Sequence, residues 1–334
     1  MKKPLRRFLR PRYIFRFVIG FIVFGMLFLV FGRPPVPQLL QNAHRIADIS
    51  HWVSYTWVDD SNIMVIERDQ NSKRLVAYRL RVNDLSRTEY PGLSKTLNEL
   101  GSDCNFLPSP DGKWIMASCM SENILRTESL ITVSNGVIAG SHFGKVVYRW
   151  LPDSSGWTED LPFSPVHLEC NLFIDGRPME ILPPILGGWG YDLETTRDGI
   201  AWLLMFVEGT RSVELSQVNY RTGKALSTNK INMPDHQQYQ HLSVSDNASK
   251  LVMQTRVGPD FWETMSLIAC KGFNSWQINE TWLLNADGSG LQLIGDADVT
   301  FDDGGSSNLN VNWVPGSRRL SIKLEDTLYY LDVK

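Results

Sequence analysis

Histidine and carboxylate side chains cluster at only a few places in the chain. His236 and His241 flank the tetrapeptide QQYQ, with Asp235 beside them, on a predicted loop. Neutral imidazole is a common metal ligand, so one interpretation of this pair is a metal site. The other is two ordinary surface histidines, which the spacing of five residues on a loop favours. We therefore predict no metal here.

A second acidic group lies in ADVTFDDGGSS (297–307). It comprises Asp298, Asp302 and Asp303. Carboxylates in a loop are the ligands that calcium prefers, but the ligand order of an EF-hand and its glycine at the sixth position are absent. A solvated acidic loop is the favoured interpretation, so we predict neither a metal nor a cofactor.

Aromatic side chains are concentrated in two further predicted loops. GGWGYDLE (187–194) carries Trp189, Tyr191 and Asp192, and the long segment 257–277 carries Phe261, Trp262 and Glu263. Exposed aromatic side chains are typical of interaction surfaces. We predict a partner or ligand surface formed by these loops together with His236 and His241. The alternative is that the aromatic side chains pack against neighbouring loops.

Motifs for catalysis are missing from the chain. The sequence contains no GxSxG nucleophile elbow, phosphate-binding loop or dinucleotide fingerprint. We assign no catalytic residue, and nothing in the sequence requires catalysis. A binding or scaffolding module is the leading hypothesis. The alternative is a hydrolase or lyase acting on glycan or peptide through acidic and histidine side chains of the loops named above.

These loops are set in a repeated pattern, of which SPDGKWIMAS (109–118) is the sharpest copy. Pro110, Asp111 and Gly112 favour a tight turn, and the apolar run after them is too short for a helix. Related turn-and-strand units occur at 57–67, 150–157, 195–206, 243–255 and 313–324. A period near 40–50 residues built from short strands indicates a propeller. We predict an all-β, six-bladed β-propeller of four-stranded antiparallel blades over residues 42–334; an open β-sandwich is the alternative.

Three stretches of the chain resemble a known family. SPDGKWIMAS, TWLLNADGSGLQLI (281–294) and WVPGSRRLSIKLEDTLYYLDV (313–333) are similar to the WD40-like repeats of the TolB-type propeller family. The resemblance covers residues 50–334 loosely. The units at 57–67, 195–206 and 243–255 depart from it, because other residues replace the Ser-Pro of the turn. The resemblance implies a propeller fold and protein partners, in envelope assembly or sensing.

Strand direction sorts the connections between strands onto two faces. The turns between first and second strands, and between third and fourth strands, share one face, which we call the turn face. The remaining, longer connections share the opposite face, which we call the loop face, and function in such scaffolds resides on loops of this kind. The final repeat ends at its third strand, so we predict that residues within 42–51 supply the fourth strand and close the ring.

The four cysteines permit one pairing prediction. In a hairpin closed around residues 110–113, Cys104 and Cys119 stand directly opposite each other. We predict a disulfide between them. Cys170 and Cys270 are left unassigned.

The N-terminal segment has the features of a membrane-targeting signal. Residues 1–33 hold eight basic and no acidic side chains, and residues 17–32 (FVIGFIVFGMLFLVFG) are uncharged. We predict a basic cytoplasmic tail (1–16), a transmembrane signal-anchor helix (17–32) in the lipid bilayer, a proline-rich tether (33–41) and an extracytoplasmic propeller (42–334). The leading partner is a protein at the cell membrane surface. A cleaved signal peptide is the alternative, although no small-residue cleavage site follows.

Charge excludes one class of partner. Residues 34–334 hold 25 basic and 36 acidic side chains, a net charge of −11. Nucleic-acid binding requires clustered Lys and Arg. We therefore predict no nucleic-acid partner.

Overall fold

The computed structural model describes most of the region after residue 37. The described residues are 19–20, 38–101, 103–120, 126–143, 146–151, 153–160, 171–174, 177–180, 191–195, 199–206, 212–219, 222, 224–232, 238–245, 247–257, 276–300 and 309–333. Within these ranges the backbone forms six four-stranded antiparallel sheets.

We number the sheets in chain order. Sheet 1 contains β2 (Trp52–Trp57), β3 (Asn62–Arg68), β4 (Leu75–Arg81) and β5 (Arg87–Glu89). Sheet 2 contains β6 (Cys104–Pro108), β7 (Trp114–Met120), β8 (Arg126–Thr132) and β9 (Ile138–Phe143). Sheet 3 contains β10 (Val146–Trp150), β11 (Trp157–Asp160), β12 (Asn171–Ile174) and β13 (Arg177–Glu180).

The remaining strands complete three further sheets. Sheet 4 contains β14 (Tyr191–Thr195), β15 (Ile200–Phe206), β16 (Ser212–Asn219) and β17 (Lys224–Asn232). Sheet 5 contains β18 (Gln238–Val244), β19 (Lys250–Val257), β20 (Trp276–Asn285) and β21 (Gln292–Thr300). Sheet 6 contains β22 (Leu309–Trp313), β23 (Arg319–Leu324), β24 (Thr327–Asp332) and, at its outer edge, β1 (His44–Asp48).

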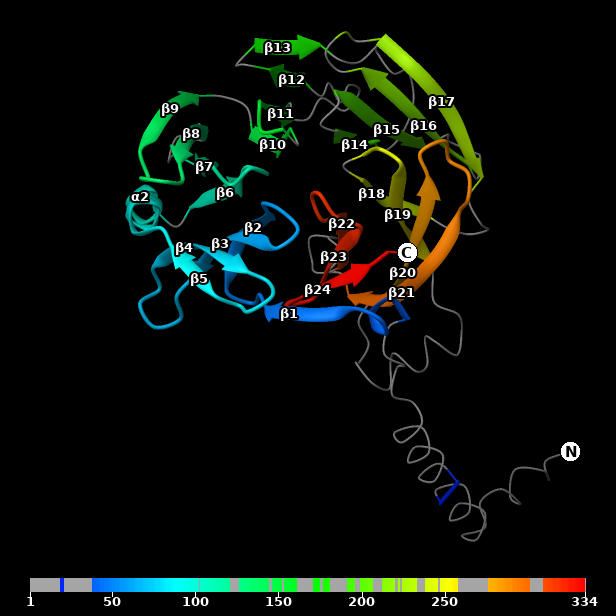
Figure 1. Cartoon of the computed structure of the whole chain (residues 1–334), viewed down its shortest axis with the longest axis horizontal. Helices are drawn as coiled ribbons and strands as arrows, with labels where there is room; N and C mark the ends of the chain where they lie inside the picture. The colour runs from blue at the N-terminus through cyan, green and yellow to red at the C-terminus, as the bar shows by residue number, and fades with distance from the viewer. Residues whose placement is uncertain are drawn as a thin grey trace, which may run out of the picture.

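The sheets are set around a common centre, as Figure 1 shows. First strands of neighbouring sheets approach one another, as β2 and β6, β14 and β18, and β18 and β22 do. In each predicted turn unit, the apolar residues after the turn form the second strand of a sheet. Ile63, Ile115, Trp202, Leu251 and Leu320 in those strands are no more than 1% exposed. The repeat therefore marks the layer where adjacent sheets bury their apolar faces.

The fourth strand of sheet 6 comes from the other end of the chain. β1 pairs antiparallel with β24, with His44 opposite Tyr330 and Asp48 opposite Thr327. The predicted closing strand within 42–51 is confirmed. It satisfies an edge of β24 that would otherwise present unpaired backbone groups.

The chain reaches β1 through a short 3-10 turn, η2 (Gln38–Leu40). Leu39 is 1% exposed and lies so close to the backbone of β21 that a Cβ at Gly295 would approach its Cα to 2.5 Å. Gln38 N–H donates to the Asp296 carboxylate at 3.3 Å. The entering chain is thus fixed between sheets 5 and 6, and Gly295 is required there because no side chain fits.

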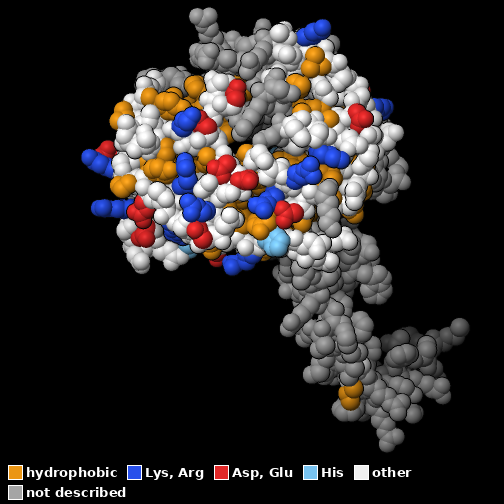
Figure 2. All heavy atoms as spheres, in the orientation of Figure 1, with side chains coloured by type: hydrophobic (Ala, Val, Ile, Leu, Met, Phe, Trp, Pro, Cys, Tyr) orange, Lys and Arg blue, Asp and Glu red, His pale blue; other side chains and the backbone are white. Residues whose placement is uncertain are grey.

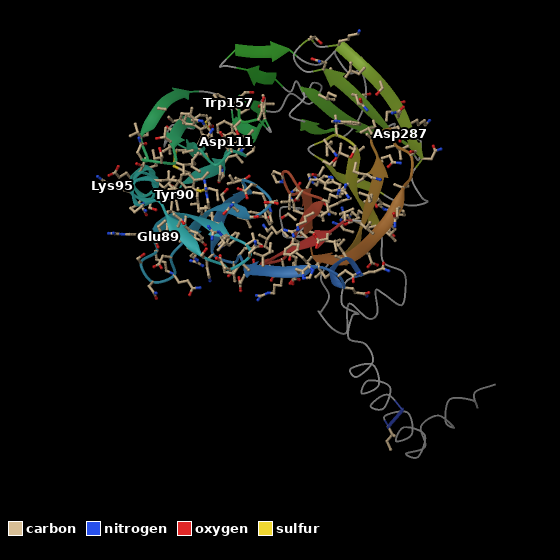
Figure 3. The ribbon with its side chains drawn as sticks, viewed as in Figure 1. Glu89, Tyr90, Lys95, Asp111, Trp157 and Asp287 are labelled. Atoms are coloured by element: carbon tan, nitrogen blue, oxygen red, sulfur yellow. A yellow bond between two sulfur atoms is a disulfide. The ribbon has the colours of Figure 1, made fainter. Side chains whose placement is uncertain are left out.

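Helix α2 (Pro91–Leu100), between sheets 1 and 2, was not predicted. Its fully buried Leu93 and Leu97 pack with β4 and β6 side chains in one core cluster. β5 pairs with only part of the β4 edge, and side chains of α2 form hydrogen bonds with the remaining backbone groups. Asn98 accepts from Leu75 N–H at 2.9 Å and donates to Leu75 O at 2.7 Å. A side chain of the helix thus pairs with backbone groups of β4 that a fourth strand would otherwise bind. Lys95, on the outer side of the helix, projects away from the sheets (Figure 3).

The predicted anchor, residues 17–32, lies outside the described residues except for Ile19 and Gly20. The same holds for the basic tail, 1–16, and for most of the tether. In the part of the chain that the structure describes, no helix has the length and apolar character needed to cross a bilayer.

Candidate functional site

The turn in SPDGKW (109–114) is held by its own side chains. Ser109 Oγ donates to Asp111 Oδ1 at 2.7 Å and accepts from Trp114 N–H at 3.0 Å, and Asp111 Oδ1 accepts from Lys113 N–H at 3.1 Å. Burial raises the pKa of Asp111, but the hydrogen bonds from Ser109 and Lys113 outweigh it, so this pKa lies below the ordinary value. Gly112, with φ of +66°, completes the reversal.

Sheet 5 repeats this geometry with different residues. Ser245 Oγ donates to Asn247 Oδ1 at 2.9 Å and accepts from Lys250 N–H at 3.0 Å. Asn247 Oδ1 also accepts from Ser249 N–H at 3.1 Å. Ala248, with φ of +53°, occupies the place of Gly112. The turn is therefore conserved in geometry between sheets 2 and 5 although its sequence differs.

These turns also join neighbouring sheets. Asp111 N–H, in sheet 2, donates to Ser154 Oγ of the sheet 3 turn at 3.0 Å. A Cβ at Gly112 would approach Val58, at the end of β2, to 2.9 Å. Figure 3 shows Asp111 near the inner end of its sheet and Asp287, in the turn between β20 and β21, at the periphery. The SPDGKW turn, the sharpest copy of the repeat in the sequence, thus has a structural role in holding neighbouring sheets together.

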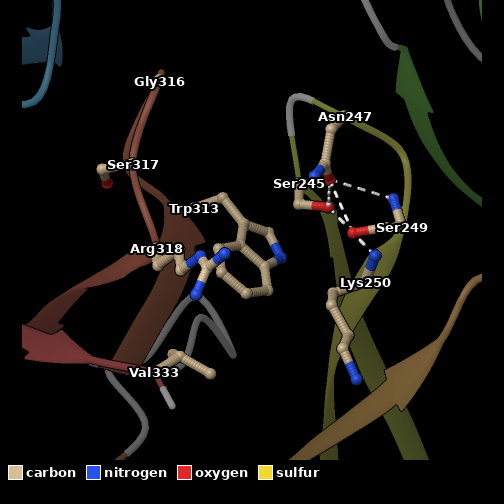
Figure 4. A pocket seen from close by; sticks show the side chains of 9 residues that line it. All are labelled: Ser245, Asn247, Ser249, Lys250, Trp313, Gly316, Ser317, Arg318 and Val333. Carbon is tan, nitrogen blue, oxygen red and sulfur yellow. Dashed lines mark hydrogen bonds between the residues drawn. The ribbon is translucent and has the colours of Figure 1, made fainter.

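A cavity of about 500 Å³ lies between the first turns of sheets 5 and 6, on the turn face. Figure 4 shows its lining: Ser245, Asn247, Ser249, Lys250, Trp313, Gly316, Ser317, Arg318 and Val333. These nine residues include two cationic side chains and no carboxylate or histidine. These described residues therefore include no general acid–base pair, and they place positive charge beside an aromatic ring. The residues predicted from the sequence to form a site were assigned to connections on the opposite face, so the cavity was not predicted.

The connections between strands differ between the two faces as the sequence predicted. On the turn face they are short, as at 109–113, 245–249 and 314–318. On the loop face they include 161–170, 181–190 and 258–275. The large variations in length are thus on the face opposite the cavity.

Most predicted loop-face residues lie outside the described part of the chain. These are Trp189, His236, Phe261, Trp262 and Glu263, and with them Asp302 and Asp303 of the acidic loop. Tyr191 and Asp192 were expected in a loop, but they are the first two residues of β14, opposite Met205 and Leu204. Asp298 was also expected in a loop, but it belongs to β21, opposite Ile278, because that strand continues to Thr300.

His241 is the predicted site residue with a described contact. It was placed on a loop, but it lies inside β18, half-buried, after a bulge between Tyr239 and His241. Its Nε2 and Asn312 Oδ1 on β22 are 2.9 Å apart. The side chain thus ties sheet 5 to sheet 6. Among the described residues, no three His, Cys, Asp or Glu side chains form a group able to hold a metal ion.

Cys104 and Cys119 are opposite partners in the ladder of β6 and β7, and a disulfide joins them with an S–S distance of 2.03 Å. Cys170 and Cys270 lie outside the described residues. The bond fixes the register of the hairpin that carries the SPDG turn.

Charged side chains of both signs are interspersed on the face seen in Figure 2, with hydrophobic side chains among them. Two exposed apolar side chains belong to the turn face. Leu85 and Val137, in the turns between third and fourth strands of sheets 1 and 2, are 51% and 56% exposed.

No family model matches the chain, and no curated protein matches it. Among solved structures, the chain is similar to the oligogalacturonate lyase of Vibrio parahaemolyticus, with 12% identity over 84% of this chain and 76% of that one and a TM-score of 0.51. It also resembles a putative TolB from Agrobacterium tumefaciens (15% identity, 74% and 80% covered, TM-score 0.46). TolB from Acinetobacter baumannii gives 13% identity, 86% and 65% covered, and a TM-score of 0.47.

The class of protein that fold and comparisons define is a β-propeller. Its solved neighbours include TolB proteins at low identity. Identities at this level define the fold and leave the function to be argued from this chain's own residues.

Proposed function

We propose that this chain is a membrane-anchored, six-bladed propeller that binds a partner protein through its loop face. In this proposal the six sheets are the blades, residues 17–32 anchor the chain, and residues 1–16 are cytoplasmic. The propeller lies outside the cytoplasm.

One observation carries the proposal: the chain enters the propeller on the side opposite its long loops. β24 runs toward the turn face, because it follows the connection at 325–326 on the loop face. β1 is antiparallel to β24, so its first residue, His44, lies at the turn-face end. Any anchor that precedes residue 38 therefore holds the turn face nearest the membrane. The loop face is directed away from it, toward a partner.

A propeller enzyme is the alternative, and no described group of residues favours it. His241 is engaged with Asn312, and the described residues of the cavity lining include no acid or histidine. The lyase similarity concerns the fold only.

Anchoring is tested by alkaline extraction of membranes that contain the full chain or a chain starting at Pro34. The proposal expects the full chain to stay with the membrane and the shortened chain to be released. Release of both would contradict the anchor.

Partner binding is tested by photocrosslinking in the native membrane. A photoreactive amino acid replaces either Tyr191, at the loop-face end of β14, or Ser289, in the turn-face connection of β20 and β21. Crosslinking to a protein is expected from position 191 only. It should be lost when Phe261 and Trp262 are both changed to Ala. Leu85→Ala with Val137→Ala, a matched loss of exposed apolar side chains on the turn face, should leave it unchanged. Crosslinking from position 289 alone would contradict the proposal.

A further inference from the structure

We propose that the cavity between the first turns of sheets 5 and 6 is a binding site for a phosphate group. The two cationic side chains that line it are Lys250, from β19, and Arg318, from the turn before β23. None of the described residues that line the cavity carries a carboxylate, although residues 34–334 carry a net charge of −11. Positive charge is thus concentrated at a hollow in an otherwise acidic body, which attracts anions.

Arg318 is available to a ligand. Its side chain is exposed, and it has no ion-pair or hydrogen-bond partner among the described residues. The next residue shows the contrast: Arg319 Nε donates to Asp332 Oδ1 at 2.8 Å, and its guanidinium lies 4.8 Å from the centre of the Tyr330 ring. Of two adjacent arginines, one stabilises sheet 6 and the other faces the cavity. A guanidinium presents a fork of donors that matches phosphate oxygens.

Lys250 is positioned for the same role. Its Nζ donates to Asn285 Oδ1 at 2.8 Å, which fixes the ammonium group. An ammonium has three donors, so two remain for a ligand. Figure 4 shows Lys250 at the start of β19 and Arg318 in the turn before β23, with Trp313 between them in this view. The two charges therefore come from different sheets.

The frame of the cavity is rigid. Trp313 N–H donates to Ser243 Oγ at 3.1 Å, and Val311 N–H donates to Gln254 Oε1 at 3.2 Å, so the strand that carries the lining residue Trp313 is tied to sheet 5. On the other side, Asn247 closes the Ser245–Ser249 turn. Preorganised donors reduce the entropy that a ligand loses on binding. The volume falls in the range of small-molecule sites, and the Trp313 ring offers an apolar wall for an attached carbon skeleton.

Two sources of phosphate can reach this site. The cavity is on the face where the chain enters the propeller, so a lipid headgroup is one source. A soluble phosphate compound is the other. The site lies opposite the proposed partner surface, and phosphate binding does not depend on it.

The test is isothermal titration of the full chain, in neutral detergent, with inorganic phosphate and with glycerol 3-phosphate. One saturable site is expected, with an affinity that falls as sodium chloride is added. Lys250→Gln and Arg318→Gln should each weaken binding about tenfold or more, because each removes a charge-assisted hydrogen bond. Lys113→Gln, which removes an exposed cation from the equivalent turn of sheet 2, should leave the affinity unchanged. Thermal unfolding of each variant checks that it is folded.

The two affinities distinguish the two sources of phosphate. Tighter binding of glycerol 3-phosphate than of inorganic phosphate supports the site and indicates a lipid headgroup, and equal binding supports it and indicates free phosphate. Absence of binding by both compounds overturns the proposal. Binding that persists unchanged when Lys250 and Arg318 are both changed to Gln also overturns it.

Discussion

His44 and Tyr330 lie directly opposite each other in the ladder between β1 and β24, and their rings stack with centroids 4.9 Å apart. The Arg319 guanidinium, which is bound to Asp332, also lies over the Tyr330 ring, 4.8 Å from its centre. This row of contacts crosses three strands of sheet 6 and joins the first strand of the propeller to its last. Aromatic and cation–π contacts of this kind add to the backbone pairing. Closure of the ring is therefore made by side chains as well as by the ladder.

The first turns of sheets 2 and 5 provide a matched pair of substitutions with opposite expected effects. Gly112 and Ala248 occupy equivalent places with φ of +66° and +53°. A left-handed conformation costs an alanine roughly 1–2 kcal/mol, and glycine avoids that cost while gaining some entropy in the unfolded chain. Ala248→Gly should therefore raise the free energy of unfolding by roughly 0.5 kcal/mol.

Gly112→Ala should lower that free energy by about 1 kcal/mol or more, because the strain is added to a close approach to Val58. Urea unfolding of both variants measures the two changes. Equal effects of the same sign would mean that the two turns do not share a geometry.

Acid should lower the stability that the turn at 109–114, between β6 and β7, contributes to the fold. The folded pKa of Asp111 is depressed, so its contribution to stability is fully present above the unfolded pKa and is lost as pH falls through the folded pKa. The parent chain should lose stability as pH falls below about 4, the ordinary aspartate value.

Asp111→Asn should keep the Oδ1 acceptor, as Asn247 does in sheet 5, and should show a smaller loss over the same pH range. Thermal unfolding at stepped pH measures both chains. Other turn aspartates, such as Asp287, also have lowered pKa values, from Ser289 hydrogen bonds, so the variant should retain part of the acid sensitivity. An identical pH dependence in the two chains would contradict a role for the Asp111 charge.

The repeat in the sequence predicted more of the fold than of the site. The residues after each turn identified the second strand of all six sheets, because a buried apolar run behind a tight turn has few other structures open to it. Helix α2 was missed, although Leu93 and Leu97 have helical spacing after Pro91, because the propeller pattern called for a loop there. Tyr191 and Asp192 were assigned to a loop because glycines precede them, yet pairing with β15 extends the strand.

The cavity could not be found in the sequence. Lys250 and Arg318 are 68 positions apart, and each lies in or next to a turn whose sequence indicates a structural role only. Only the placement of sheet 5 beside sheet 6 brings their side chains to one hollow. Long-range neighbours of this kind follow from topology and packing, which local patterns do not specify.

The most direct test of the account is a disulfide between β1 and β24. The variant His44→Cys with Tyr330→Cys places two thiols at opposite positions of the ladder, where Cβ atoms are about 4.5–5.5 Å apart. We predict that mild oxidation forms an intramolecular disulfide, identified by peptide mapping of the monomer. His44→Cys with Thr327→Cys, three residues out of register, should form little. A bond absent from the first variant, or formed equally in both, would show that the N-terminal strand does not close the ring as described.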